Sequence, residues 1–361
     1  MQVTKRLRTH HSYSPGLQPD SWDSVIKLNT NENPYPPSPS VIEAVTKEIS
    51  LLNLYPNPAS MPLRDKISQL FGLDKNQVII GNGSDDLLNL CVRSFSDDDL
   101  KVGMLDPSYS LYKTLVNVQG ANLIKIPFVD DEFTFDPKEV SSSGANLFFL
   151  TSPHAPSGRS FSLKTLKKTA ESFPGLLVID EAYADFAAET ALPLLNDFEN
   201  VLITRTLSKS YSLAGLRLGF AMGHSSIIAQ LDQVREVYNV DRLAQAAALA
   251  SLNDQNYFSN CLEKILQQRE WLTNQLEAMK WRTIPSSSNF VFTQPCDNQG
   301  KRGEKIALSL FEFLNQRKIL VRYFPDHPLT NTFLRISIGK PEEMSILIES
   351  IEKWKCREKQ L

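Results

Sequence analysis

Residues 205–220 read RTLSKSYSLAGLRLGF, and the apolar run Val201–Thr206 that leads into them predicts a buried strand. Lys209 therefore stands just beyond a strand end, with Ser208 before it and Arg217 after it. A lysine in this position is suited to hold a cofactor as a Schiff base beside a cation that binds its phosphate. A solvated surface lysine is the commoner alternative, so Lys209 alone decides nothing.

Around this stretch, short apolar runs alternate with segments of helical periodicity. This order is typical of a parallel α/β sheet covered by crossover helices. The predicted strands are 77–80, 101–105, 146–150, 176–180, 201–206 and 218–222, and the predicted helices include 85–95, 162–172 and 226–237. We therefore expect residues 41–245 to form a large α/β domain.

The two flanks differ from this pattern. Upstream, Pro- and Asn-rich residues 29–39 precede a helix that Ser38 can cap, with Val41, Ile42, Val45 and Ile49 facing inward. Downstream, helices over 245–252 and 257–279 precede strands over 289–293, 319–323 and 333–338. We expect residues 1–40 to form an N-terminal arm and residues 246–361 a smaller α+β domain.

Composition favours small-molecule chemistry. The 361 residues carry a net charge of −3 with acidic and basic residues interspersed, which gives no footprint for nucleic acid or an anionic membrane. The four cysteines are far apart and predict neither disulfides nor a metal site. With no apolar run long enough for a signal peptide or a membrane span, the sequence predicts a cytoplasmic protein.

A carboxylate ends a second predicted strand. Asp180 closes the apolar run Leu176–Asp180, and Tyr183 follows it. Ligands of open α/β sheets bind at the carboxyl edge, so we expect Asp180 and Lys209 to meet there. An aspartate beneath a pyridine ring keeps the ring nitrogen protonated. A helix cap or a salt bridge explains Asp180 equally well from the local pattern.

Two further strand ends carry candidate ligand groups. The turn Gly83-Ser84-Asp85 offers backbone N–H groups at a helix start, which suit a phosphate dianion. Glycine in such a turn often serves the backbone alone. Tyr109, in Asp106-Pro-Ser-Tyr109, is placed to stack on an aromatic cofactor, or is simply packed.

These elements together resemble class-I/II aminotransferases, and more narrowly the histidinol-phosphate aminotransferases, over nearly the whole chain. The motifs that carry the resemblance are LNTNENPYP (28–36), GSD (83–85), SPHAPSG (152–158), DEAY (180–183), residues 205–220, NFVF (289–292) and LRISIG (334–339). Each is modest alone, but their order and spacing are specific. The resemblance implies a fold-type I pyridoxal-phosphate enzyme with a mostly parallel seven-stranded sheet between helices.

The resemblance also implies roles on the cofactor side. Lys209 holds pyridoxal 5'-phosphate as a Schiff base, Asp180 pairs with its pyridine nitrogen, and Tyr183 hydrogen-bonds its phenolic oxygen. The cofactor phosphate is held by a set of groups from three parts of the chain: Gly83, Ser84, Asp85, Ser208 and Arg217. Tyr109 stacks on the ring. Tyr55 reaches the cofactor phosphate of a neighbouring subunit, so a homodimer is implied, with the arm packed against the small domain and the partner.

On the substrate side, the resemblance implies that Arg335 binds the carboxylate of the amino donor glutamate, a task that a guanidinium fork suits. Arg322 and Tyr13 match positions that engage the phosphate of a phosphorylated keto acceptor, and Asn33 is a further substrate-binding candidate. For Arg322 and Tyr13, a surface ion pair and an anchor of the arm are the structural alternatives.

One position departs from the family pattern. Many relatives carry asparagine where Ala155 stands, and that asparagine hydrogen-bonds the phenolic oxygen of the cofactor. Either His154 supplies the missing donor or Tyr183 serves this oxygen alone.

The function expected from the resemblance is transamination between L-histidinol phosphate and 2-oxoglutarate in histidine biosynthesis. Three alternatives remain open from the sequence. They are an aromatic amino acid transaminase, a decarboxylase of a phosphorylated amino acid such as threonine phosphate, and a catalytically retired ligand sensor. No helix-turn-helix motif or basic patch supports the sensor.

Overall fold

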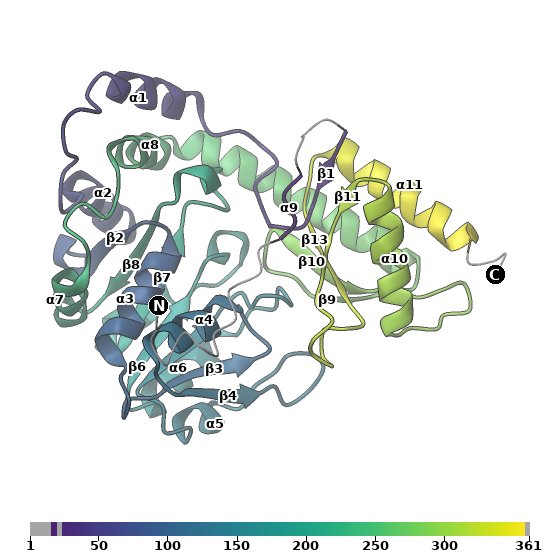
Figure 1. Cartoon of the computed structure of the whole chain (residues 1–361), viewed down its shortest axis with the longest axis horizontal. Helices are drawn as coiled ribbons and strands as arrows, with labels where there is room; N and C mark the ends of the chain where they lie inside the picture. The colour runs from purple at the N-terminus through teal and green to yellow at the C-terminus, as the bar shows by residue number, and fades with distance from the viewer. Residues whose placement is uncertain (1–15, 20–23, 358–361) are drawn as a thin grey trace, which may run out of the picture.

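The computed structural model describes residues 16–19 and 24–357, which form two packed units (Figure 1). The larger is built on a seven-stranded sheet in the order β2-β8-β7-β6-β5-β3-β4. Its strands are β2 (Val78–Gly81), β3 (Val102–Asp106), β4 (Leu123–Pro127), β5 (Leu147–Thr151), β6 (Leu176–Asp180), β7 (Val201–Thr206) and β8 (Gly219–Gly223). β8 runs antiparallel to its two neighbours, β2 and β7, and all the other adjacent strands are parallel. The expected mostly parallel seven-stranded sheet is confirmed.

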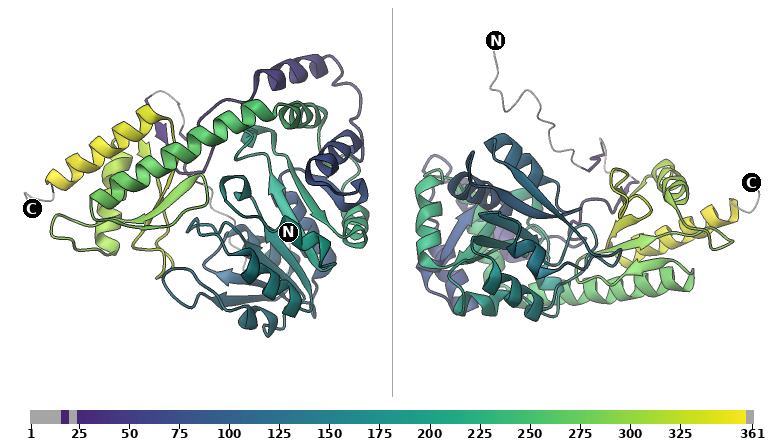
Figure 2. Two further views of the ribbon diagram at one scale, coloured as in Figure 1. Left: turned by 180° about the vertical axis from the view of Figure 1, so that it is seen from behind. Right: turned by 90° about the horizontal axis from the view of Figure 1, so that it is seen from below.

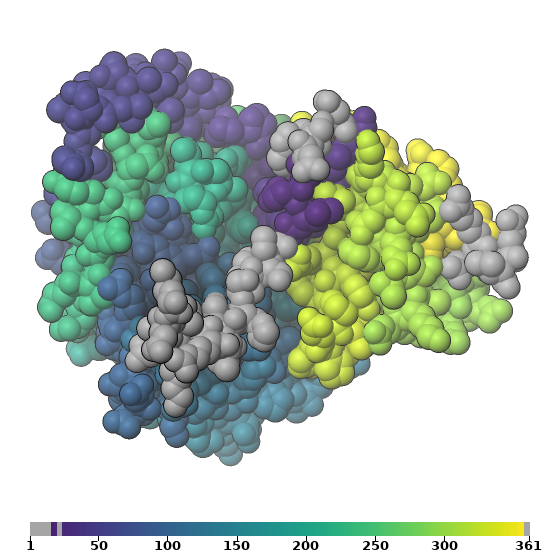
Figure 3. All heavy atoms as spheres, viewed as in Figure 1, coloured from purple at the N-terminus to yellow at the C-terminus, as the bar shows by residue number. Residues whose placement is uncertain are grey.

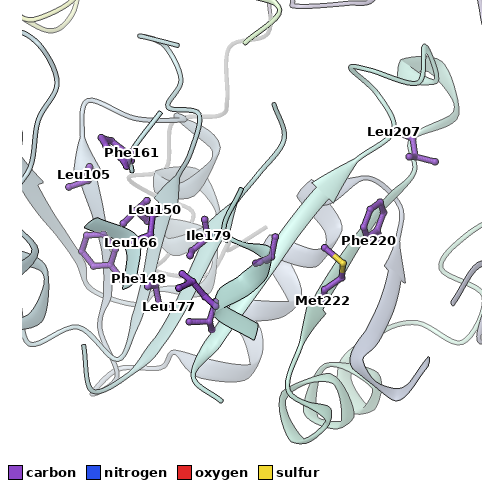
Figure 4. Packing of buried hydrophobic residues seen from close by; sticks show 14 of the residues in the cluster. Leu105, Phe148, Leu150, Phe161, Leu166, Leu177, Ile179, Leu207, Phe220 and Met222 are labelled. Atoms are coloured by element: carbon purple, nitrogen blue, oxygen red, sulfur yellow. The ribbon is translucent and has the colours of Figure 1, made fainter. Parts of the chain in front are cut away.

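Alternate side chains of the central strands pack into hydrophobic cores on opposite faces of the sheet. Phe148, Leu177 and Ile179 belong to the hydrophobic core on one face, whereas their neighbours Phe149 and Val178 belong to the core on the other. Successive side chains of a strand point to opposite faces, so a strand buried on both faces is apolar throughout. Figure 4 shows Phe148, Leu177 and Ile179 gathered with Leu166, a residue of α6.

Helices cover both faces of this sheet. They are α2 (Met61–Phe71), α3 (Ser84–Phe95), α4 (Leu111–Gln119), α5 (Pro137–Ser141), α6 (Leu163–Ser172), α7 (Ser225–Val234) and α8 (Arg242–Asn253). Short 3-10 turns lie at Lys75–Gln77, Ala184–Phe186, Leu192–Asn196 and Ala214–Leu216. The edge strand β4 escaped the sequence analysis because most of its side chains are at least partly exposed and give no buried run.

Helix α1 (Pro39–Ile49) begins as predicted, with Ser38 accepting a hydrogen bond from the backbone N–H of Ser40. It packs against α8 through the buried Val41. The prediction that Ile42 and Ile49 also face inward is wrong, because they are 60% and 53% exposed. An amphipathic pattern marks an apolar face but does not say what covers it.

The smaller unit holds a four-stranded antiparallel sheet in the order β12-β13-β10-β9. Its elements are α9 (Gln255–Ala278), β9 (Arg282–Ile284), β10 (Phe290–Gln294), α10 (Glu304–Gln316), β11 (Ile319–Leu320), β12 (Arg322–Tyr323), β13 (Leu334–Ser337) and α11 (Pro341–Arg357). The long helix α9 runs from the large unit along the small one (Figure 2). The predicted boundary between residues 245 and 246 lies inside α8, whose buried alanines belong to the core of the large unit.

The described part of the N-terminal arm lies against the small unit (Figure 3). Strand β1 (Ile26–Lys27) pairs in parallel with β11, and the backbone N–H of Leu28 donates to the carbonyl of Leu320. The arm then crosses towards the large unit over residues 29–37. Among the described residues, no helix is long and apolar enough to cross a membrane.

Candidate active site

A cavity of about 670 Å³ opens at the carboxyl ends of the central strands and is closed on its other side by the arm and the small unit. It is lined by ten of the residues singled out from the sequence: Ser84, Asp85, Tyr109, Asp180, Tyr183, Ser208, Lys209, Arg217, Arg322 and Arg335. The topology thus brings strand ends and small-unit strands together around one volume, as expected for a ligand site of an open α/β sheet.

Lys209 follows β7, and its side chain is partly buried. Its amine donates to the carbonyl of Thr30 at 3.2 Å. Burial first, and then the positive charge of Arg335, lower the pKa of Lys209 to about 8. An amine with a lowered pKa is more often neutral near neutral pH, which is the form that attacks a carbonyl and accepts a proton.

Asp180 ends β6 and is 2% exposed. The hydroxyl of Tyr112 donates to Oδ2 of Asp180 at 2.7 Å, and that of Thr204 donates to Oδ1 at 3.2 Å. Burial raises the pKa of Asp180 to about 6, while the two hydroxyls act in the opposite direction. A buried carboxylate at the edge of a cavity suits a cationic ligand group, because the opposite charge offsets the cost of burying the carboxylate.

Tyr112 was not among the residues predicted from the sequence, although its spacing from Tyr109 is a signal. Tyr112 lies in the first turn of α4, three positions after Tyr109, and the centroids of the two rings are 5.5 Å apart. Tyr112 is fully buried and stacks on Phe149 with ring centroids 4.7 Å apart.

A buried ion network fixes the loop that carries Lys209. Arg205 pairs with Glu181 at 2.7 Å and with Asp185 at 3.3 Å, and the hydroxyl of Ser210 donates to Asp185. These contacts join the residues just after β6 to those on both sides of Lys209. Glu181 was visible only as part of the DEAY motif and had no assigned role.

The turn at residues 83–85 and Arg217 form a cradle of donors at one end of the cavity. Gly83 precedes α3 with a φ of +80°, and a Cβ placed there meets the guanidinium of Arg217 at 2.8 Å. Arg217 donates to Asp85 at 2.8 Å and to the hydroxyl of Ser208 at 3.4 Å. The free N–H groups of a helix start beside a guanidinium suit an anion.

Arg322 and Arg335 lie opposite each other on the adjacent strands β12 and β13. Each guanidinium lies over the ring of Phe324, at 5.6 Å and 5.2 Å from its centroid. Arg335 also donates to the carbonyl of Asn29 at 3.2 Å. The two cations therefore give the outer part of the cavity a positive wall suited to anionic substrate groups.

His154 does not line the cavity, and the expectation that it binds the cofactor is wrong. Its ring is fully buried, with Nδ1 2.8 Å from the hydroxyl of Ser157 and Nε2 2.9 Å from the carbonyl of Pro107. Burial lowers the pKa of His154 to about 4, so the ring is neutral. With both nitrogens engaged by the protein, His154 is a packing residue; Ala155 beside it does line the cavity.

Asn33 and Tyr55 do not line the cavity either. Asn33, expected to bind substrate, instead donates to the carbonyl of Ser210 at 3.0 Å and accepts from the backbone of Tyr35, which corrects that expectation. Tyr55 is 76% exposed and stacks on Tyr238 at 4.4 Å. Tyr13 lies outside the described residues.

Comparison with known proteins agrees with this geometry. The family model for aminotransferase class I and II matches residues 23–351. A histidinol-phosphate aminotransferase of Geobacter sulfurreducens is 46% identical over 94% of this chain and 96% of its own length. One from Synechocystis is 42% identical over 98% of this chain and 99% of its own.

Solved structures show the same architecture. A histidinol-phosphate aminotransferase from Sinorhizobium meliloti, crystallised in complex with pyridoxal-5'-phosphate, superposes with a TM-score of 0.85 at 27% identity, covering 92% of this chain and 91% of that one. An L-threonine-O-3-phosphate decarboxylase from Porphyromonas gingivalis reaches a TM-score of 0.78 at 18% identity, which establishes only the shared fold. The chain belongs to the class I and II aminotransferases and, within them, to the histidinol-phosphate aminotransferase family.

Proposed function

We propose that this aminotransferase uses pyridoxal 5'-phosphate to exchange an amino group between L-histidinol phosphate and 2-oxoglutarate, giving imidazole acetol phosphate and glutamate. The observation that carries the proposal is the meeting of Lys209 and Asp180 in one cavity with the anion cradle at residues 83–85 and 217. The names of the relatives, at 46% and 42% identity, support the choice of substrate.

The cavity fits this cofactor by the chemistry of its groups. Asp180 is a buried carboxylate that suits a protonated ring nitrogen, because the positive charge would offset the cost of its burial. Lys209 is a partly buried amine that lines the same cavity and is suited to attack a carbonyl carbon. Ser84, Ser208 and Arg217 would hold the phosphate. The volume of about 670 Å³ leaves room for both cofactor and substrate.

When bound, the cofactor supplies an electron sink that stabilises negative charge at the substrate carbon. The chain's own residues do the rest. The Asp180 carboxylate would keep a proton on the ring nitrogen, and Tyr183 would donate to the phenolic oxygen. The Lys209 amine would be the base that accepts the proton from the substrate carbon and holds it for return.

Two neighbouring arginines support a pair of anionic substrates. Arg335 would bind the carboxylate of glutamate, and Arg322 would bind the phosphate of the histidinol compound. Because the two guanidiniums lie on paired strands, one cavity serves a dicarboxylate and a phosphate ester in turn. The second arginine argues against an aromatic transaminase, because the side chain of an aromatic substrate has no negative charge for it to bind. No specific contact favours the decarboxylase or the sensor.

The homodimer belongs to the same proposal. A surface patch formed by α1, the segment after it and residues 237–238 carries Ile42, Ile49, Leu51, Leu52, Leu54, Tyr55, Val237 and Tyr238, all substantially exposed. An apolar patch of this kind on a soluble enzyme is typical of a subunit interface. Tyr55 would then reach the phosphate cradle of the partner. All four cysteines are free thiols, which accords with the cytosolic location expected from the sequence.

The test is a pair of half-reactions followed by absorbance. Glutamate should change the spectrum of the bound cofactor, imidazole acetol phosphate should restore it, and phenylpyruvate should restore it far more slowly. Lys209→Ala should abolish both conversions, whereas Lys167→Ala, a surface lysine paired with Asp197, should leave them intact. Equal restoration by phenylpyruvate would favour the aromatic enzyme, and carbon dioxide release without conversion would favour the decarboxylase.

A further inference from the structure

Asn31 belongs to the arm and follows Thr30, whose carbonyl accepts a hydrogen bond from the amine of Lys209. It is 1% exposed and lines the cavity, and its carboxamide nitrogen donates to the hydroxyl of Tyr183 at 2.8 Å. Its φ is +56°, a left-handed conformation that asparagine tolerates better than most residues. The sequence alone indicates no role for Asn31 beyond its place in the LNTNENPYP motif.

The orientation of the Asn31 carboxamide is fixed by hydrogen bonds. The backbone N–H of Asn31 donates to the hydroxyl oxygen of Ser337 at 2.9 Å. The proton of Ser337 is therefore left for Oδ1 of Asn31, 3.1 Å away. Asn289 clamps the same peptide by donating to the carbonyl of Asn31 at 2.9 Å. With the carboxamide oxygen facing Ser337, the nitrogen must face Tyr183.

This orientation also fixes the direction of the next hydrogen bond. The oxygen of Tyr183 accepts from Asn31, so the single proton of the Tyr183 hydroxyl remains available to an acceptor in the cavity. A hydroxyl that already accepts a hydrogen bond is a stronger donor, because chains of hydrogen bonds polarise one another. Burial raises the pKa of Tyr183, and Arg335 and then Asn31 counteract that rise.

The residues at positions 154 and 155 supply no second donor beside the Tyr183 hydroxyl. Ala155 lines the cavity with a methyl group, and the ring of His154 is directed to Ser157 and Pro107 instead. Many relatives have two side chains that hydrogen-bond the phenolic oxygen, an asparagine at the position of Ala155 and the tyrosine. In this chain only Tyr183 is left for that role. If the hydroxyl proton of Tyr183 pointed elsewhere, the phenolic oxygen of the cofactor would have no donor from this side chain.

We propose that Asn31 is a positioning residue that turns the Tyr183 hydroxyl into an obligate donor to the phenolic oxygen of the cofactor. It acts through two hydrogen bonds in series, from Ser337 to Asn31 and from Asn31 to Tyr183. This arrangement compensates for the hydrogen-bond donor that Ala155 lacks. The inference rests on the proposed cofactor but not on the identity of the amino acceptor. The structural alternative is that Asn31 only anchors the arm to β13.

A double-mutant cycle of Asn31 and Tyr183, followed by the absorbance of the bound cofactor, distinguishes these two roles. The readout is the pH midpoint of the cofactor's absorbance change, with no substrate present. Hydrogen-bond donation to the phenolic oxygen stabilises its ionised form and lowers this midpoint. Asn31→Gly removes the carboxamide without straining the left-handed backbone. We expect it to raise the midpoint by about one pH unit, the size of one net hydrogen bond.

In the Tyr183→Phe background, the same Asn31→Gly change should produce no further shift, because no hydroxyl remains to be directed. Equal shifts in both backgrounds, or no shift in either, would overturn the inference and leave Asn31 as an anchor. Ser337→Ala is the second variant if Asn31→Gly binds cofactor poorly. It frees the carboxamide to rotate and should give a smaller upward shift that also vanishes with Tyr183→Phe.

The outcome is independent of the substrate assignment. If glutamate fails to convert the wild-type cofactor while the cycle behaves as stated, the proposed transamination fails and the role of Asn31 stands. If transamination proceeds as proposed and the cycle shows no coupling, only the role of Asn31 fails.

Discussion

The hydroxyl of Tyr112 donates a hydrogen bond to Oδ2 of Asp180 at 2.7 Å in the fully buried floor of the active site. The two residues are 68 positions apart in the sequence. Thr151, 2.7 Å from the same hydroxyl, completes the arrangement. Because the Tyr112 proton goes to the carboxylate, it favours the ionised form of Asp180 that a protonated ring nitrogen needs.

Tyr112→Phe removes this hydrogen bond and keeps the ring that stacks on Phe149. The pKa of Asp180 should rise further, and the affinity for pyridoxal phosphate should fall about tenfold, the value of one hydrogen bond to a charged group. Equilibrium titration of the apoenzyme with cofactor measures this. Tyr257→Phe, whose hydroxyl donates to the carbonyl of Pro36, is the matched control and should bind normally; equal affinities in both variants would contradict the prediction.

Asp180→Asn should stabilise the apoenzyme at neutral pH. Burial raises the pKa of Asp180 to about 6 from 3.8, so the folded state binds more protons than the unfolded state between these values. Wild-type stability is therefore lost as the pH rises through this window. The variant lacks that loss and should be more stable by about 3 kcal/mol above pH 7 and about 1 kcal/mol near pH 4.5. Urea unfolding of both apoenzymes measures it, and a pH-independent difference would refute it.

The capture of cofactor by the apoenzyme should follow the titration of Lys209. Its pKa is lowered to about 8 by burial and then by Arg335, so the rate should rise with pH and level off above about pH 8. Arg335→Gln removes a positive charge and should move the profile up by about one pH unit. Stopped-flow absorbance measures the rates. Arg322→Gln is the control for a general loss of charge, and an equal shift in that variant would rule out a specific effect of Arg335.

Arg322 and Arg335 should separate in their effects on the two substrates. Arg322→Ala should raise KM for imidazole acetol phosphate about 10- to 100-fold more than KM for glutamate, because a charge-assisted hydrogen bond to phosphate is lost. Arg335→Ala should show the opposite preference. Steady-state kinetics with each substrate varied in turn measures both ratios. Parallel losses for both substrates would mean that the two arginines act as one charge cluster.

Leu52→Glu should weaken the proposed dimer. Leu52 is 57% exposed within the apolar patch, and a buried carboxylate at the interface is unfavourable. Sedimentation equilibrium should show a shift towards monomer, with loss of activity at low protein concentration. Val129→Glu is the control, since Val129 is 69% exposed but lies at the far edge of the sheet, after β4. A Leu52→Glu protein that sediments like wild type would place the interface elsewhere.

Much of the active site was predictable because its residues sit at strand ends that the sequence marks clearly. The apolar runs before Asp180 and Lys209 end at the residues where β6 and β7 end. Residues were missed or misassigned where their role depends on contacts between distant parts of the chain. Asn33 and His154 are such cases, since nothing local distinguishes a cavity-facing side chain from one that packs against a neighbouring loop.

The sequence by itself determined the α/β class, the two-sided burial of the central strands and the position of the lysine and aspartate at one edge of the sheet. These follow from local periodicity and from the rule that parallel strands share a carboxyl edge. Only the tertiary structure decided that Asn31 orients Tyr183 across 152 positions and that Ser337 orients Asn31 across 306. The direction of a hydrogen bond depends on which donor and acceptor groups lie close together in the fold. A sequence pattern determines neither the distance between these groups nor which of them donates the proton.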